Sequence, residues 1–222
     1  MGWFLDPVWF GDYPASLRKS KAHHLPPFTP QQKQQLVGSV DFIAANAFTA
    51  KWVSARPGGT GTGWQDAKTN SSGQLIGSAT GVPWMSVVPW SQEKMLQYLS
   101  KRYTTSQGPP AILITSSGTQ VPGEERKSLP GVVDDVFRVD YYAKYLNSVC
   151  SAVATGGVKL IGWFAWSLFD GFEWTDGFGR KFGLVHVSYQ GPQGSPAADG
   201  QLRRTPKASA RWLSQHFFKQ GP

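Results

Sequence analysis

The stretch Val158-Lys159-Leu160-Ile161-Gly162-Trp163-Phe164-Ala165-Trp166 decides the fold, together with the Ser167-Leu168-Phe169-Asp170-Gly171-Phe172-Glu173-Trp174 that follows it. The first run is apolar apart from one lysine, and such a run predicts a strand buried on both faces of a sheet. Two shorter apolar runs, 40–46 and 111–115, predict two more buried strands. Because a helical pattern precedes each strand, the order along the chain indicates parallel βα units.

Four helices are predicted around these strands. Thr29 is a good N-cap and Pro30 suits the first helical position, so one helix is expected over 30–38. Ser91 is expected to cap a second helix over 92–102. Val136, Val139, Tyr142, Tyr145, Leu146 and Val149 fall at helical spacing and predict a long amphipathic helix over 132–154. A last helix is expected over 206–218.

The segments between these elements carry weaker signals. Residues 3–18 are rich in aromatic residues and proline without clear periodicity, and 181–189 is expected to form a hairpin. Residues 54–81 are rich in Gly, Ser and Thr, which predicts a long flexible loop. Loops of this length in compact domains are commonly functional or disordered.

These elements make only part of a barrel. A closed barrel of parallel strands needs about eight strands, and the pattern here provides fewer. An open piece would leave two sheet edges and one apolar face uncovered. The predicted fold class is therefore α/β, a partial (β/α)8 TIM barrel. Residues 1–222 would form one domain that needs a complementary partner.

Composition excludes several classes of protein. The chain is 40% hydrophobic and 16% charged, which is too apolar for a disordered chain. No apolar run is long enough to predict a membrane span, and the first residues lack the pattern of a signal peptide. The compartment is left open. Cys150 is the one cysteine of the sequence, so no internal disulfide is expected.

The net charge of +8 and the pI near 9.6 raise nucleic-acid binding as an alternative. The basic residues are dispersed apart from short pairs such as Lys101-Arg102 and Arg203-Arg204, and no zinc-finger, RNP-type or basic-helix pattern accompanies them. We therefore rank a nucleic-acid site last. The same charge would suit an acidic protein partner.

Several motifs resemble those of glycoside hydrolase family 1, the retaining β-glucosidases and their relatives. The stretch 166–174 is similar to the family's W-S-L-x-D-N-F-E-W. The stretches 2–7 and 11–14 are similar to its G-W-F-L-D-P and G-D-Y-P, and 204–207 to its R-x-P-K. The resemblance covers nearly the whole chain in the family's order. It implies that the three strands are barrel strands six, seven and eight.

The resemblance also implies a sugar-binding wall. Glu173 would accept hydrogen bonds from two hydroxyls of a glucose-like ring, and Trp174 would donate its indole N–H. Trp166 would be the stacking platform, and Phe182 and Asn46 would complete the pocket for a β-glucoside ligand. Aromatic faces and charged hydrogen-bonding groups suit sugar recognition. The alternative is that the aromatic cluster is barrel-end core, although a carboxylate there needs a partner. No metal or cofactor is implied.

The same resemblance indicates that the catalytic groups are missing. Retaining glycosidases use two carboxylates. Ser116 stands at the position of the nucleophilic Glu of T-E-N-G, and Ser117 stands at that of its Asn. Phe48 replaces a tyrosine, Gly171 replaces an asparagine, and Ser188 replaces the Asp of V-D-Y. The Asn-Glu-Pro that carries the acid/base does not occur in the chain. We expect no catalysis by this chain alone.

Three functions remain open at this point. The first is a catalytically inactive structural or binding subunit, whose partner is the missing N-terminal barrel half or another protein subunit. The second is part of a retaining β-glucosidase or transglycosidase that hydrolyses O-glycosyl bonds once a separate N-terminal half completes it. Here the small Ser116 would leave room for an external anion. The third is a carbohydrate-binding module that performs no chemistry.

Overall fold

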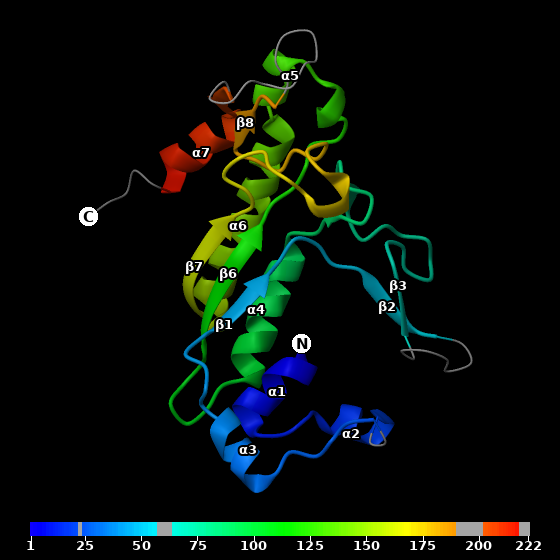
Figure 1. Cartoon of the computed structure of the whole chain (residues 1–222), viewed down its shortest axis with the longest axis vertical. Coiled ribbons are helices and arrows are strands. Elements are labelled where there is room, and N and C mark those ends of the chain that lie inside the picture. Colours follow the sequence, from blue (N-terminus) through cyan, green and yellow to red (C-terminus); the bar gives the residue numbers. More distant parts are fainter. Residues whose placement is uncertain (22–23, 57–63, 190–201, 218–222) are drawn as a thin grey trace.

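A three-stranded parallel sheet forms the centre of the molecule in the computed structural model, which describes residues 1–21, 24–56, 64–189 and 202–217 (Figure 1). Its strands are β1 (Ile43–Asn46), β6 (Ala111–Ser117) and β7 (Lys159–Ala165), in the order β1-β6-β7. The three strands coincide with the three predicted apolar runs. A parallel sheet with helices between its strands confirms a partial α/β barrel.

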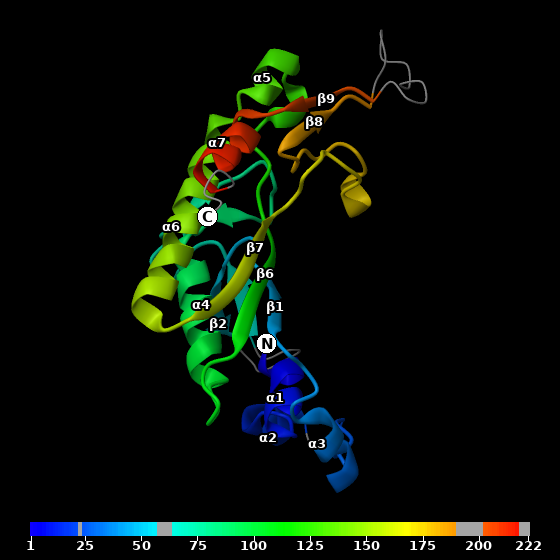
Figure 2. The same cartoon turned by 90° about the vertical axis from the view of Figure 1, so that its left-hand side faces the viewer.

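Two long helices cover one face of this sheet. Figure 2 shows α4 (Trp90–Arg102) and α6 (Val136–Gly156) side by side against the strands, and the two helices pack on each other. The core between helices and strands is apolar and buried, and it includes Ile43, Leu96, Leu99, Ile112, Ile114, Val149 and Val158. Burial of these side chains is the main force that holds helices and sheet together.

The other face of the sheet is open, so the expectation that the strands are buried on both faces was wrong. Ile161 and Phe164 of β7 are 52% and 58% exposed. Along β1, Ile43 and Ala45 are buried while Ala44 and Asn46 are exposed. This alternation arises because three strands form only part of a barrel wall, and no strand of the described residues completes the barrel opposite them.

The N-terminal segment is helical, although residues 3–18 show no clear periodicity. It forms α1 (Gly2–Phe10) and α2 (Ala15–Lys21), followed by α3 (Pro30–Leu36). The buried carboxylate of Asp6 accepts a hydrogen bond from Tyr103 Oη at 2.7 Å and pairs with Arg102, which docks α1 on the end of α4. Tertiary contacts therefore stabilise a helix that the sequence pattern does not reveal. The capping box of Thr29 with Gln32 confirms the predicted start of α3.

Parts of three short strands lie within the segment 54–81, which was predicted to be one flexible loop. β2 (Trp52–Ala55) pairs antiparallel with β3 (Trp64–Ala67), and β4 (Ser78–Ala79) pairs with β5 (Ser86–Val87). Residues 57–63 lie outside the described residues. Every residue of β2 and β3 is exposed, and backbone hydrogen bonds, the Lys51–Asp66 ion pair and the contact of the Trp52 ring with Trp90 support this strand pair. That explains why no apolar pattern signalled it.

Other boundaries also differ from the prediction. The N-cap of α4 is Pro89, because Ser91 instead donates its hydroxyl to the carbonyl of Val88. The helix expected over 132–154 is two helices, α5 (Leu129–Val133) and α6. The predicted hairpin over 181–189 was wrong: β8 (Val185–Val187) pairs with the distant β9 (Arg204–Pro206). The last helix, α7, spans Ala208–Phe217, and residue 218 lies outside the described part of the chain.

Two short 3-10 helices lie in loops at the carboxyl end of the sheet. The first, η2 (Glu124–Arg126), follows β6, and the second, η3 (Trp174–Asp176), follows β7. None of the described helices is both long and apolar enough to cross a membrane.

Candidate sugar-binding site

The predicted site residues follow the carboxyl ends of neighbouring strands. Asn46 ends β1 and lies in register with Ser116 near the end of β6. Trp166 follows β7 directly, and its backbone N–H donates to the carbonyl of Ser117 at 2.8 Å. The carboxyl ends of parallel strands meet at one end of a barrel, where active sites of this fold lie. The sheet thereby brings Asn46, Ser116 and Trp166 to one end of the molecule.

Ser116, which the motif resemblance predicts at the position of the family's nucleophile, is hydrogen-bonded to Asn46. Its hydroxyl donates to Asn46 Oδ1 across 2.6 Å, and Thr115 Oγ1 donates to the same oxygen across 2.7 Å. Ser116 is only 6% exposed. The two hydroxyl donors satisfy the amide oxygen, so the polar groups at this position form a neutral cluster without a carboxylate.

The neighbouring substituted positions are also integrated in the interior. Gln92 Nε2 donates both to Ser117 Oγ at 2.8 Å and to the carbonyl of Ala47 at 2.7 Å. The carbonyl of Phe48 accepts hydrogen bonds from Tyr141 and Tyr145, each at 3.2 Å. These contacts link β1, β6, α4 and α6 beneath the site, and they fix the backbone at the ends of both strands.

The sequence indicates that the carboxylate of Glu173 needs a partner without naming one, and in the structure Trp166 contacts it. The indole N–H of Trp166 donates to Glu173 Oε1 at 3.2 Å, and Glu173 is 9% exposed. Burial raises the pKa of Glu173 and exceeds the opposing effect of the Trp166 hydrogen bond, and the nearby charges of Asp170 and Asp176 raise it further.

Trp174 and Phe182 occupy opposite environments. Trp174 begins η3 and is 82% exposed, with a backbone φ of 51° in the left-handed region. A tryptophan in that region is strained, and such strain concentrates at functional sites. Phe182 is buried against Val82 and Met85, and its ring meets that of Phe48 edge-on at 6.4 Å. The structure therefore places Phe182 in the core at the edge of the site and presents Trp174 to solvent.

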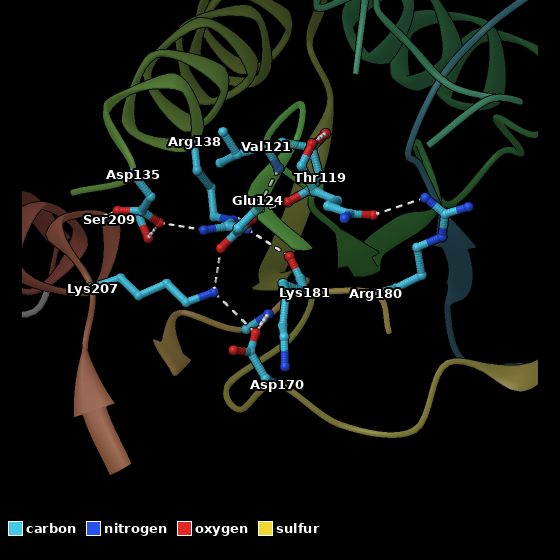
Figure 3. A network of polar contacts seen from close by, with 12 residues as sticks. Thr119, Val121, Glu124, Asp135, Arg138, Asp170, Arg180, Lys181, Lys207 and Ser209 are labelled. Carbon is cyan, nitrogen blue, oxygen red and sulfur yellow. Dashed lines mark hydrogen bonds and ion pairs between the residues drawn. The ribbon is translucent and has the colours of Figure 1, made fainter. Parts of the chain in front are cut away.

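A buried network of charges supports the loop that carries Glu173, and sequence reasoning missed it. Figure 3 shows Lys207 between two carboxylates, with Nζ 2.7 Å from Glu124 Oε1 and 2.9 Å from Asp170 Oδ1. Arg138 lies 2.5 Å from Glu124 Oε2, and it also pairs with Asp135. All five residues are at most 1% exposed. Buried charges are tolerated only when paired in this way.

The one sequence signal for the network lies on α6. Arg138 is placed four residues before Tyr142 and seven before Tyr145, both predicted on the buried face of that helix. In the structure Arg138 is fully buried beside them, whereas Val136, which was predicted on the same face, is 62% exposed. An arginine in phase with the apolar face of a helix indicates a buried carboxylate partner. Its partners are distant in sequence and could not be named.

The charged groups of the network shift one another's pKa values. Burial opposes ionisation of Asp170, but the hydrogen bond from His186 and the charge of Lys207 outweigh it and hold the pKa of Asp170 below its usual value. Burial and the charge of Arg138 lower the pKa of Lys207, against the pull of Glu124 and Asp170. Both carboxylate oxygens of Glu124 are held by cations, Oε1 by Lys207 and Oε2 by Arg138. The described residues include no group of three His, Cys, Asp or Glu that could hold a metal ion.

Comparisons with known proteins define the class to which this fold and site belong. The family model for glycosyl hydrolase family 1 matches residues 1–221. Beta-glucosidase 42 of Arabidopsis thaliana is 38% identical over 99% of this chain, which covers 43% of that protein. Beta-glucosidase 4 of Oryza sativa subsp. japonica is 34% identical over 99% of this chain, which covers 44% of that protein. The chain thus spans less than half the length of these relatives.

Solved structures give the same result. The structure of beta-glucosidase 2 from Trichoderma reesei, in complex with Tris, matches 98% of this chain with a TM-score of 0.87 and 35% identity. The family 1 beta-glucosidase of Humicola insolens, in complex with glucose, matches 97% with a TM-score of 0.87 and 34% identity. This chain covers 45% and 43% of those chains. The chain belongs to glycosyl hydrolase family 1, and its fold is a partial barrel of that family.

Proposed function

We propose that the chain is a β-glucoside-binding subunit of a larger assembly and that it performs no hydrolysis. The observation that carries the proposal is the hydrogen bond from Ser116 to Asn46 at the position of the family's nucleophile. A serine hydroxyl needs an adjacent base to become a nucleophile. The partner of Ser116 is a neutral amide oxygen, which accepts a hydrogen bond but cannot remove the proton at neutral pH.

Sugar binding is supported by the pair of Trp166 and Glu173. Trp166 holds one carboxylate oxygen of Glu173, so the carboxylate is oriented before a ligand arrives. Trp166 and Trp174 are 41% and 82% exposed, and they offer aromatic surface beside this acceptor. A carboxylate next to exposed aromatic rings suits paired hydroxyls and a C–H face. The glucose complex of the Humicola insolens relative makes a β-glucoside the first ligand to test.

The role as a subunit is supported by the open sheet. Among the described residues, β1 and β7 each pair with β6 alone, so each presents one unpaired edge. Unpaired edges beside exposed apolar side chains such as Ile161 and Phe164 favour association. The net charge of +8 would suit an acidic partner. We propose that the complementary barrel half, or another subunit, covers this surface.

Two measurements test the proposal. Calorimetry with cellobiose should detect binding to the wild-type chain, and Glu173→Ala should abolish it while Glu125→Ala, at an exposed position, should not. Sedimentation of the chain purified from its native source should show a complex with another polypeptide. If calorimetry detects no binding, the proposed sugar ligand is wrong. If the chain is a stable monomer with its sheet edges uncovered, the proposed role as a subunit is wrong.

The second candidate is a β-glucosidase or transglycosidase completed by a separate N-terminal half. The specific observation in its favour is that a small, neutral side chain at position 116 leaves space for an external anion. The test is turnover of an aryl β-glucoside with the complementary half present, with and without azide, and again with Ser116→Glu. If no combination gives turnover, this candidate is wrong.

A further inference from the structure

A second set of chemically reactive side chains lies where β8 ends, outside the sugar-binding wall. His186 Nδ1 lies 3.0 Å from Asp170 Oδ2, and His186 Nε2 lies 3.5 Å from Ser188 Oγ. Asp170 is 1% exposed, whereas His186 and Ser188 are half-buried. The contacts lead from a buried carboxylate through an imidazole to the hydroxyl of a half-buried serine.

The surroundings of Asp170 determine which nitrogen of His186 carries the proton. Oδ1 of Asp170 accepts from Lys207 Nζ and from the backbone N–H of Gly183, each at 2.9 Å. The pKa of Asp170 lies below its usual value despite burial, because His186 and Lys207 stabilise the carboxylate, so Oδ2 can only accept a hydrogen bond. In neutral His186 the proton must therefore be on Nδ1. Nε2 is left as an acceptor that faces the hydroxyl of Ser188.

This arrangement matches the requirements for an activated serine. The nucleophile is next to a base, and a third group orients that base. The distance of 3.5 Å between Ser188 Oγ and His186 Nε2 is longer than the usual nucleophile–base distance of about 2.6–3.2 Å, and such distances commonly shorten when a substrate binds. The backbone N–H of Ser188 donates to the carbonyl of Arg203 at 3.0 Å, which fixes the position of the serine on the paired strands β8 and β9.

We propose that Ser188 is a nucleophilic serine that is acylated by small carboxylic esters, with His186 as its base and Asp170 as the positioning residue. The family resemblance places an aspartate at position 188, and a carboxylate there could not act as this nucleophile. The proposed nucleophile is therefore a residue at which this chain departs from the family's motif. It is independent of the function proposed for Glu173 and Trp166.

The step balances without an oxidant or a metal. Ser188 Oγ bonds to the carbonyl carbon of the ester while its proton moves to His186 Nε2, and the C–O bond to the alcohol breaks as that proton passes to the leaving oxygen. Water then attacks the acyl group with His186 again as base. Ser188 is restored and the carboxylic acid is released, so ester and water become acid and alcohol.

The direct test uses a biotin-tagged ethoxy fluorophosphonate on the full chain. The Oγ–P bond forms as the P–F bond breaks, and fluoride leaves with the serine proton. Mass spectrometry should find one adduct per chain, assigned by fragmentation to Ser188. His186→Gln keeps a side-chain N–H for Asp170 but removes the base, so labelling should slow by about 100-fold. Ser39→Ala, at an exposed serine whose hydroxyl donates to the carbonyl of Leu36, should leave labelling unchanged.

A second variant tests the site without relying on the His186 substitution. Ser188→Cys places a thiol beside the imidazole, which favours the thiolate. The exposed Cys150 of the same molecule provides the internal reference. Iodoacetamide should alkylate the new thiol at least several-fold faster than Cys150. Equal or slower alkylation, no fluorophosphonate adduct at Ser188, or an adduct formed equally fast in His186→Gln would each overturn the proposal.

Discussion

Lys207 and Asp170 form an ion pair in which both side chains are fully buried, with Nζ 2.9 Å from Oδ1. The same ammonium lies 2.7 Å from Glu124 Oε1, so one cation joins the segment between β9 and α7 to the loops that follow β6 and β7. The loop held in this way includes Glu173. The geometry of the candidate sugar site therefore depends on a contact outside that site.

Lys207→Met should be severely destabilising. It leaves Glu124 and Asp170 buried without their shared cation, and breaking a buried pair typically costs about 3–5 kcal/mol. Lys33→Met provides the matched control, because Lys33 pairs with Asp12 across 2.6 Å on the surface and such pairs contribute about 0–1 kcal/mol. Urea denaturation of the two variants measures the difference. Equal losses would show that the network contributes no more than an exposed ion pair.

Glu173→Gln should change how stability depends on pH. The folded state raises the pKa of Glu173 through burial, so the protonated form is favoured on folding. Its contribution is complete below the unfolded pKa of about 4.3 and is lost as pH rises through the higher folded value. The free energy of unfolding of the glutamine variant should therefore rise relative to that of wild type between about pH 4 and pH 7, the window in which Glu173 of the wild type ionises.

Thermal unfolding at a series of pH values checks this prediction. Glu125→Gln removes an exposed carboxylate and should follow the wild-type pH dependence. A glutamine variant at position 173 that tracks wild type over the whole range would contradict the buried, hydrogen-bonded environment of Glu173.

Ser116→Ala should have a small effect on stability. The variant loses one neutral hydrogen bond, worth about 1 kcal/mol, while Asn46 Oδ1 keeps its 2.7 Å contact with Thr115. Thr115→Val should behave in the same way, and the double variant should cost more than either. Guanidinium denaturation provides the values. A loss above about 3 kcal/mol for Ser116→Ala would contradict this prediction, because it would indicate that Ser116 bonds to a charged group rather than to the neutral amide of Asn46.

Trp174→Gly should be more stable than Trp174→Ala. Glycine adopts the left-handed backbone at φ 51° without the strain that any Cβ introduces, a difference of about 1 kcal/mol. Because the indole is 82% exposed, its removal costs little in either variant. Comparison of the two unfolding midpoints isolates the backbone effect. A more stable alanine variant would contradict the strained conformation at this position.

The sheet was predictable because its three strands are apolar runs bounded by turns. The alternation of helix and strand also predicts their parallel direction. Thr29 and Gln32 fixed the start of α3 through local hydrogen bonds, which depend only on neighbours in sequence. The sequence also indicated that the carboxylate of Glu173, set among aromatic residues, needs a partner, although it did not identify Trp166 as that partner. These features are local, or they repeat with a regular period.

The features that were missed depend on residues far apart in the chain. α1 is stabilised by Asp6 against Tyr103, at a separation of 97 residues, and no periodicity signals it. β8 pairs with β9 across residues 188–203, whose sequence has turn signals such as Gly191-Pro192 and Asp199-Gly200 but is too long to predict a hairpin between these two strands. The carboxylate partner of Lys207 is 83 residues away at Glu124. A single sequence shows that such charges exist but not which ones meet.

Every charged member of the buried network lies between residues 124 and 209 of this chain. A polypeptide divided upstream of that segment would keep each of these charges paired with an opposite charge within one piece. Division between Asp170 and Lys207 would leave orphaned charges on both pieces, at a cost of several kcal/mol. The barrel wall can therefore be divided at some positions and not at others. What decides the position is whether the division separates buried ion pairs, not how many strands each piece contains.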